Sequence, residues 1–73
     1  MTDRTKAVED AVTSEWRTSR EIAEEAGLRG MEGVGAARII LRRLVRQGRA
    51  ERSERPVDTP QGPRTAATWR RRP

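Results

Sequence analysis

The 73-residue sequence contains no cysteine and no histidine, and these two absences exclude whole classes of function. Without cysteine the chain forms no disulfide, offers no thiol nucleophile and lacks the ligands of a zinc finger. Without histidine it lacks the usual general base at neutral pH and the commonest metal ligand, so its serines have no imidazole to activate them. We therefore expect no enzymatic activity, no cofactor and no metal site.

Aromatic residues and long apolar runs are also scarce. Trp16 and Trp69 are the only aromatic residues, and hydrophobic residues make up 33% of the chain, so we expect a thin core that needs both tryptophans. No apolar run approaches the ~18 residues of a membrane span, and the chain does not open on a signal peptide. We expect a cytoplasmic protein with no membrane contact, nucleoid-associated if its source is bacterial.

What the sequence has in excess is arginine, which supplies fifteen of the sixteen basic residues. Residues 1–36 hold five basic and eight acidic groups, a balance of −3, whereas residues 37–73 hold eleven basic and three acidic groups, a balance of +8. A basic half beside an acidic half predicts a polyanionic partner that approaches from one side. Arginine also favours forked contacts with phosphates and guanine edges.

The first predicted helix covers residues 4–14, with Asp3 as its N-cap. Its apolar residues repeat at i, i+1, i+4 and i+5, which places them on one face. Residues 15–17 follow as a short extended link. The residues predicted to face inward are Ala7, Val8, Ala11 and Val12.

The second predicted helix covers residues 19–26. Thr18 and Glu21 form a capping box at its start, and Gly27 fits the left-handed residue that ends many helices. We expect its inward residues to be Ile22, Ala23 and Ala26, and its acidic side chains to face away from a polyanion. The glycine-rich LRGMEG that follows is expected to be a flexible connection. It is not preceded by a strand, and its glycine spacing differs from that of a dinucleotide-binding loop.

The third predicted helix covers residues 33–47, in the stretch VGAARIILRRLVRQG, and Gly48 ends it. At ~100° per residue its aliphatic side chains form a clean core stripe. The stripe consists of Val34, Ala37, Ile40, Leu41, Leu44 and Val45. The opposite face collects Glu32, Gly35, Ala36, Ile39, Arg42, Arg43 and Arg46.

The remaining residues predict a β-hairpin over 49–70. RAERSE and RTAATWR suit two short strands, joined by a proline-rich loop in which Pro60 and Gly62 fit a type I turn. Residues 71–73 are expected to fray. The basic side chains that flank the hairpin are Arg52, Arg55, Arg64 and Arg70.

The string TSREIAEEAGL followed by VGAARIILRRLVRQGRAER resembles a winged helix-turn-helix, and the resemblance covers about residues 4–70. It implies an α+β fold with three helices and a C-terminal two-stranded β-hairpin wing, forming a single domain over residues 1–73. Transcriptional regulators and the DNA-reading domains of DNA translocases share this outline. The connection at 27–33 is longer and richer in glycine than the usual turn of three or four residues.

The resemblance implies sequence-selective binding of double-stranded DNA, with the third helix in the major groove and the wing along the backbone. We expect Arg43 to reach a guanine edge and Arg42 and Arg46 to touch phosphate. We expect Ile39 to face the partner, where an aliphatic side chain can contact a thymine methyl, and Gly35 and Ala36 to let the helix come close. The alternative is that Ile39 is an isolated exposed apolar residue without a role. An alternative for Arg42, Arg43 and Arg46 is that they form a solvent-exposed face near the helix C-terminus, where cations are favoured. An alternative for the arginines of the hairpin is that charged edge strands discourage aggregation.

A second function remains open at this point. The patch of Gly35, Ala36 and Ile39 also suits a winged-helix module that docks another protein. RNA binding fits less well because exposed aromatics are lacking. One such module buries only roughly 600–1,000 Å² on DNA, so we expect useful specificity to need tandem sites, a homodimer or a larger parent chain. No additional helix of the dimerising kind is present, which favours a monomer or part of a larger chain.

Overall fold

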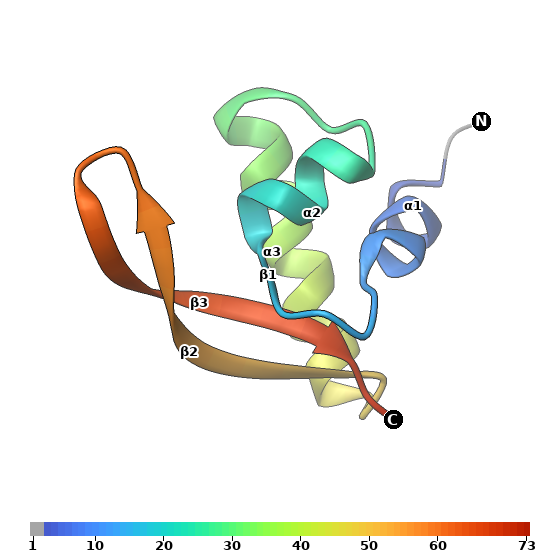
Figure 1. Ribbon diagram of the computed structural model, residues 1–73. Coiled ribbons are helices and arrows are strands. Elements are labelled where there is room, and N and C mark those ends of the chain that lie inside the picture. Colours follow the sequence, from blue (N-terminus) through green and yellow to red (C-terminus); the bar gives the residue numbers. More distant parts are fainter. Residues whose placement is uncertain (1–2) are drawn as a thin grey trace.

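Three helices pack against one end of a three-stranded antiparallel sheet in the computed structural model, which describes residues 3–73 (Figure 1). This confirms the α+β class, and the first two residues of the expected domain lie outside the described range. The sheet order is β1-β3-β2. The elements are α1 (Arg4–Ala11), β1 (Arg17–Thr18), α2 (Ser19–Glu25), α3 (Gly30–Arg46), β2 (Ala50–Thr59) and β3 (Gly62–Arg71).

Helix α1 ends three residues earlier than predicted. Its N-cap is Asp3, as expected, but Val12 already has extended backbone angles and caps the C-terminus. The chain leaves the helix here because the carbonyl of Thr13 accepts a hydrogen bond from the Arg71 amide, at 2.6 Å. The link that follows then becomes a strand, since residues 17–18 pair with β3. This third strand was not predicted, because it is only two residues long and has no periodicity of its own.

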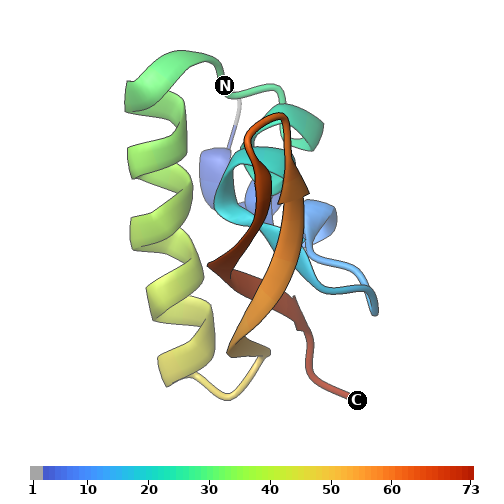
Figure 2. The same cartoon turned by 60° about the vertical axis from the view of Figure 1, so that its left-hand side comes forward.

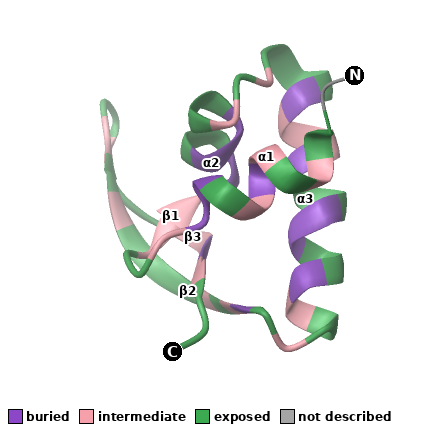
Figure 3. Cartoon of the chain, turned by 90° about the vertical axis from the view of Figure 1, so that its right-hand side faces the viewer, coloured by how far each residue is buried: buried purple, intermediate pink, exposed green. Residues whose placement is uncertain are grey.

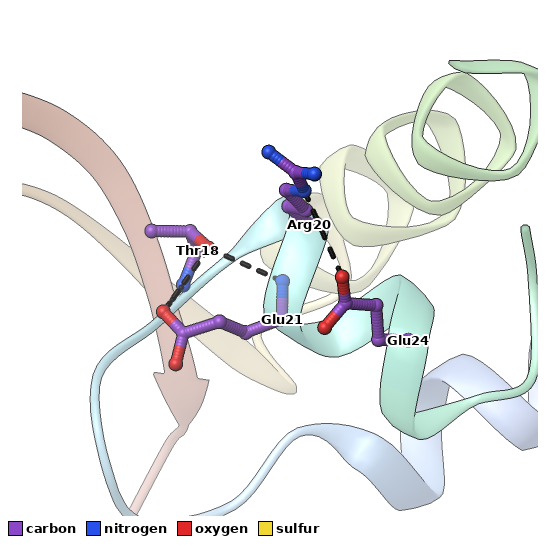
Figure 4. A network of polar contacts seen from close by, with 4 residues as sticks. All are labelled: Thr18, Arg20, Glu21 and Glu24. Atoms are coloured by element: carbon purple, nitrogen blue, oxygen red, sulfur yellow. Dashed lines mark hydrogen bonds and ion pairs between the residues drawn. The ribbon is translucent and has the colours of Figure 1, made fainter. Parts of the chain in front are cut away.

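Helix α2 begins at Ser19 as predicted and ends at Glu25, one residue earlier than predicted. The Thr18 hydroxyl accepts from the Glu21 amide, and the Glu21 carboxylate accepts from the Thr18 amide, both at 3.2 Å (Figure 4). At the other end, Gly27 has a φ of 79° and the Leu28 amide donates to the Ala23 carbonyl at 2.8 Å. This is the Schellman arrangement, which only a residue tolerant of left-handed angles allows.

Helix α3 begins at Gly30, three residues earlier than expected. The connection from α2 therefore consists only of residues 26–29, and the prediction of a long, flexible glycine loop is wrong. The reason is close packing at Gly33, where an added Cβ would lie 2.8 Å from the carbonyl carbon of Leu28. No side chain caps the start of α3, where Arg29 is the N-cap.

The predicted core stripe of α3 packs inward, but its direction is rotated. Gly33 and Ile40 are buried, whereas Val34 and Val45 are half-buried (Figure 3). The side of α3 that faces the core is therefore centred nearer to Ala37 than to Leu41. The edge of the stripe formed by Val34 and Val45 turns toward solvent. The whole core consists of Val8, Ala11, Val12, Ile22, Ala23, Ala37, Ile40, Leu41, Leu44, Ala50 and Trp69.

Strands β2 and β3 form a continuous two-stranded ribbon, longer than the two short strands predicted. The ribbon pairs from Ala50 with Arg71 to Thr59 with Gly62, so that only residues 60–61 connect the strands. Of the three prolines expected in the loop, Pro56 and Pro63 lie within strands and Pro60 lies in the connection. The two strand prolines are tolerated because β1 pairs with β3 only at residues 68 and 69. Beyond that point both edges of the ribbon are unpaired. A proline there, which has no backbone N–H, loses no hydrogen bond to a neighbouring strand. Its outer half projects beside the helices (Figures 1 and 2).

The end of the chain and one tryptophan also differ from expectation. Arg71 belongs to β3, and the Arg72 amide donates to the Arg49 carbonyl at 3.3 Å, so neither residue is frayed. Trp69 lies in the core with 6% of its surface exposed, as predicted. Trp16 is only half-buried and is not a member of the core, so that prediction is wrong.

Candidate nucleic-acid interface

An open groove lies between the ribbon and α3, and residues of α2 also contribute to its lining. Trp69 and Ala67 of β3 contribute to its lining where the ribbon meets the helices. Helix α3 supplies one wall and the ribbon supplies the other. The wall residues from α3 are Gly30, Met31, Val34, Gly35, Arg38, Arg42 and Val45, and those from the ribbon include Arg52, Val57, Asp58, Thr59 and Arg64.

The groove carries an excess of positive charge. Six arginines line it against three carboxylates, those of Glu21, Glu24 and Asp58. The first two belong to α2, so the expectation that its acidic side chains face away from this surface is wrong. Their charge is locally engaged, however, because Glu21 caps α2 and Glu24 pairs with Arg20 at 3.7 Å (Figure 4). The lining arginines are Arg20, Arg29, Arg38, Arg42, Arg52 and Arg64.

The outermost face of α3 combines apolar and basic side chains. Met31 is 91% exposed and Ile39 is 63% exposed. Gly35 lies between them at four-residue intervals, and an added Cβ there would meet no atom within 4 Å. Arg42 and Arg46 continue the same face toward the end of the helix, and both are exposed. Ile39 therefore lies on the arginine side, as the sequence predicts.

The structure brings together only part of the predicted site. Gly35 and Arg42 of α3 line the same groove as Arg52 and Arg64 of the ribbon. Arg43 is exposed but does not line the groove, because it lies on the far side of Ile39 around the helix. The other predicted residues of α3 also lie outside the lining, with Ala36 half-buried and both Ile39 and Arg46 exposed.

The four predicted arginines of the ribbon divide into two pairs. Arg52 and Arg64 line the groove, and the Arg52 guanidinium lies 5.9 Å from the ring centre of Trp69. Arg55 and Arg70 instead lie over Trp16, with guanidinium-to-ring distances of 5.1 and 4.5 Å, and neither lines the groove. Two of the four arginines therefore hold the link before β1 against the sheet.

Arg38 and Met31 are among the residues of this surface that were not anticipated from the sequence. Arg38 lines the groove, and its Nε donates to the Ser19 hydroxyl of α2 at 3.3 Å. It was overlooked because a stripe centred on Leu41 places it close to the core. Met31 was overlooked because it was assigned to the connecting loop. The burial of Gly33 explains both differences, since it extends α3 backward and rotates its inward direction.

Comparisons of the chain with protein-family models, with curated proteins and with solved structures find no match. Within residues 3–73, no group of three or more acidic side chains is placed to hold a metal ion. No helix in this range has both the length and the apolar character needed to cross a membrane.

Proposed function

We propose that this chain is a winged-helix domain that binds double-stranded DNA with sequence preference and has no catalytic activity of its own. In this proposal α3 enters the major groove and the ribbon is the wing, which lies along the adjacent backbone. The domain then serves as a transcriptional regulator or as the DNA-reading module of a larger protein. The observation that carries the proposal is the arginine-lined groove, because two separate elements place cations on its facing walls.

The dimensions of the elements suit a duplex. The major groove is about 12 Å wide and admits one α-helix, and α3 is long enough at 17 residues to lie along it. With α3 in that position, the phosphates of one strand run between the helix and the ribbon. Arg42 then meets this strand from one wall, and Arg52 and Arg64 meet it from the other. Such contacts position the domain, while the outer face of α3 meets the bases.

Titration of a labelled duplex at several salt concentrations tests the proposal. The logarithm of the binding constant should fall with the logarithm of salt, by about 0.9 for each phosphate contacted. Arg64→Ala should reduce this slope by about 1 and weaken binding to all sequences alike. Arg4→Ala is the matched control, because it removes the same charge from α1, outside the groove. Equal losses in both variants would show that only net charge matters and would contradict the groove.

One observation favours a second candidate function, that of a protein-docking module. Met31 and Ile39 are the large hydrophobic residues that the described chain leaves exposed, and Gly35 and Ala36 lie between them. If this patch docks a protein, duplex DNA should bind weakly at low salt and without a steep salt dependence. The titration described above therefore separates the two functions.

A further inference from the structure

The outer face of α3 carries two exposed apolar side chains that have no role in the phosphate contacts proposed above. Met31 and Ile39 expose 91% and 63% of their surfaces. We infer that they read thymine, each by contact with the C5-methyl group of one base in the major groove. The inference rests on the proposed function and deepens it, because it assigns a base preference to a surface otherwise defined by its charge.

The spacing of the two side chains fits two separate base pairs. They are eight residues apart on one helix, which corresponds to about 12 Å along its axis. Base pairs are stacked about 3.4 Å apart, so the two contacts fall roughly three to four steps apart on the DNA. Ile39 is β-branched and stiff, whereas Met31 is unbranched and adapts its shape to its contact. We therefore expect Ile39 to impose the stricter of the two preferences.

Gly35 makes the approach of both side chains possible. It lies midway between them, and the space that a side chain would occupy there is empty to 4 Å. Because no side chain stands above the backbone at this position, the helix approaches the base edges closely enough for both neighbours to reach methyl groups. The two apolar contacts and the bare backbone between them thus form one surface.

Charge favours DNA over a second copy of the chain as the occupant of this face. Arg38, Arg42 and Arg46 are exposed along the same helix, with Glu32 as the acidic residue of its first turn. Two copies of α3 packed face to face would bring mostly like charges together in a desolvated contact. A major groove instead presents thymine methyls on its floor and phosphates along both margins, which matches apolar residues flanked by arginines.

The test uses the duplex that the whole chain selects from a random pool. Each thymine of that duplex is replaced singly by deoxyuridine, which removes only the C5-methyl group. We expect two positions, three or four steps apart, at which the replacement weakens binding roughly threefold to fourfold. Met31→Ala should abolish the effect at one position and Ile39→Ala at the other, and Arg4→Ala should leave both effects intact. Both apolar residues are exposed, so these variants are expected to fold.

The outcomes separate this inference from the proposed function. If the chain selects and binds a duplex but every deoxyuridine version binds equally well, the methyl contacts are overturned and DNA binding stands. A selected site that contains no thymine would likewise overturn the methyl contacts and leave DNA binding intact. If no duplex is bound, the proposed function itself fails. Should Met31→Ala and Ile39→Ala instead abolish a dimer seen by sedimentation, with no change in the deoxyuridine effects, the face belongs to a second copy and the inference is overturned.

Discussion

The guanidinium of Arg70 lies 4.5 Å from the ring centre of Trp16, and its Nε donates to the Glu51 carboxylate at 2.8 Å. Arg55 of β2 lies over the same ring at 5.1 Å. A side chain that precedes β1 is thus attached to both long strands by two cations. The stacking leaves Arg70 half-buried and satisfied within the protein, which removes it from the groups available to a phosphate.

Replacing Arg70 should therefore affect stability more than DNA binding. Arg70→Ala removes a cation–π contact and a half-exposed ion pair, so we expect the free energy of unfolding to fall by about 1–2 kcal/mol. Urea denaturation followed by circular dichroism measures this change. Arg64→Ala is the matched comparison, because Arg64 is exposed in the groove and should change the salt slope instead. Similar effects of the two variants on the salt slope would place Arg70 in the interface after all.

Trp69 should contribute more to stability than any other residue of the ribbon. It is 6% exposed and lies in the core between the sheet and the helices. Trp69→Ala should cost about 3–5 kcal/mol, enough to unfold a domain this small. Trp69→Phe is the control, because it keeps an aromatic ring and removes an indole Nε1 that is buried without a hydrogen-bond partner. We expect the phenylalanine variant to remain folded in thermal denaturation, and unfolding of both variants would show that the indole itself is required.

The helix caps and the core stripe were predictable because they depend on local spacing. The Thr18–Glu21 box and the stops at Gly27 and Gly48 are all present as predicted. The short strand β1 and the early end of α1 were not predictable, because both depend on pairing with residues fifty or more positions away. A two-residue strand has no periodicity of its own, so tertiary contact alone defines it.

Gly33 and Gly35 should respond to alanine in opposite ways, although both lie within α3. Gly33→Ala places a methyl group 2.8 Å from the Leu28 carbonyl carbon, so we expect a loss of about 1–3 kcal/mol in stability. Gly35→Ala meets no neighbour and should stabilise the helix by roughly 0.5–1 kcal/mol. Thermal or urea denaturation measures both changes. Stabilisation in both variants would contradict the close packing of the α2–α3 connection.

The same pair tests how closely α3 approaches its partner. Because Gly35 lies on the outer face, Gly35→Ala should weaken binding of the selected duplex even as it stabilises the fold. A gain in stability with unchanged affinity would mean that the helix backbone stays distant from the bases. Gly33 is buried, so any loss of affinity in its variant should follow from unfolding and disappear at lower temperature.

The candidate site was predicted less completely than the fold, and helix rotation is the physical reason. The residue types of α3 show which side chains are apolar, but the rotation of the stripe depends on which neighbour approaches most closely. At Gly33 the helix meets the backbone of the preceding turn, and this contact turns Arg38 outward into the groove. Arg43 moves correspondingly toward the side of the helix away from the ribbon. The stripe read from the sequence places Arg38 near the core and Arg43 opposite it, because the spacing of residues does not contain this rotation.

Arg38 and Arg43 therefore make a decisive comparison. From its place in the groove, Arg38 should meet the phosphate strand between helix and ribbon, so Arg38→Ala should weaken binding to all sequences and reduce the salt slope. The sequence prediction assigns Arg43 to a guanine edge, in which case Arg43→Ala should relax preference at one base position by about 1–3 kcal/mol. Binding to the selected duplex and its single-base variants, measured for both proteins, provides the test. If Arg38→Ala relaxes one position and Arg43→Ala lowers all affinities equally, the two roles are exchanged and α3 lies rotated in the major groove, with the ribbon-facing side toward the bases.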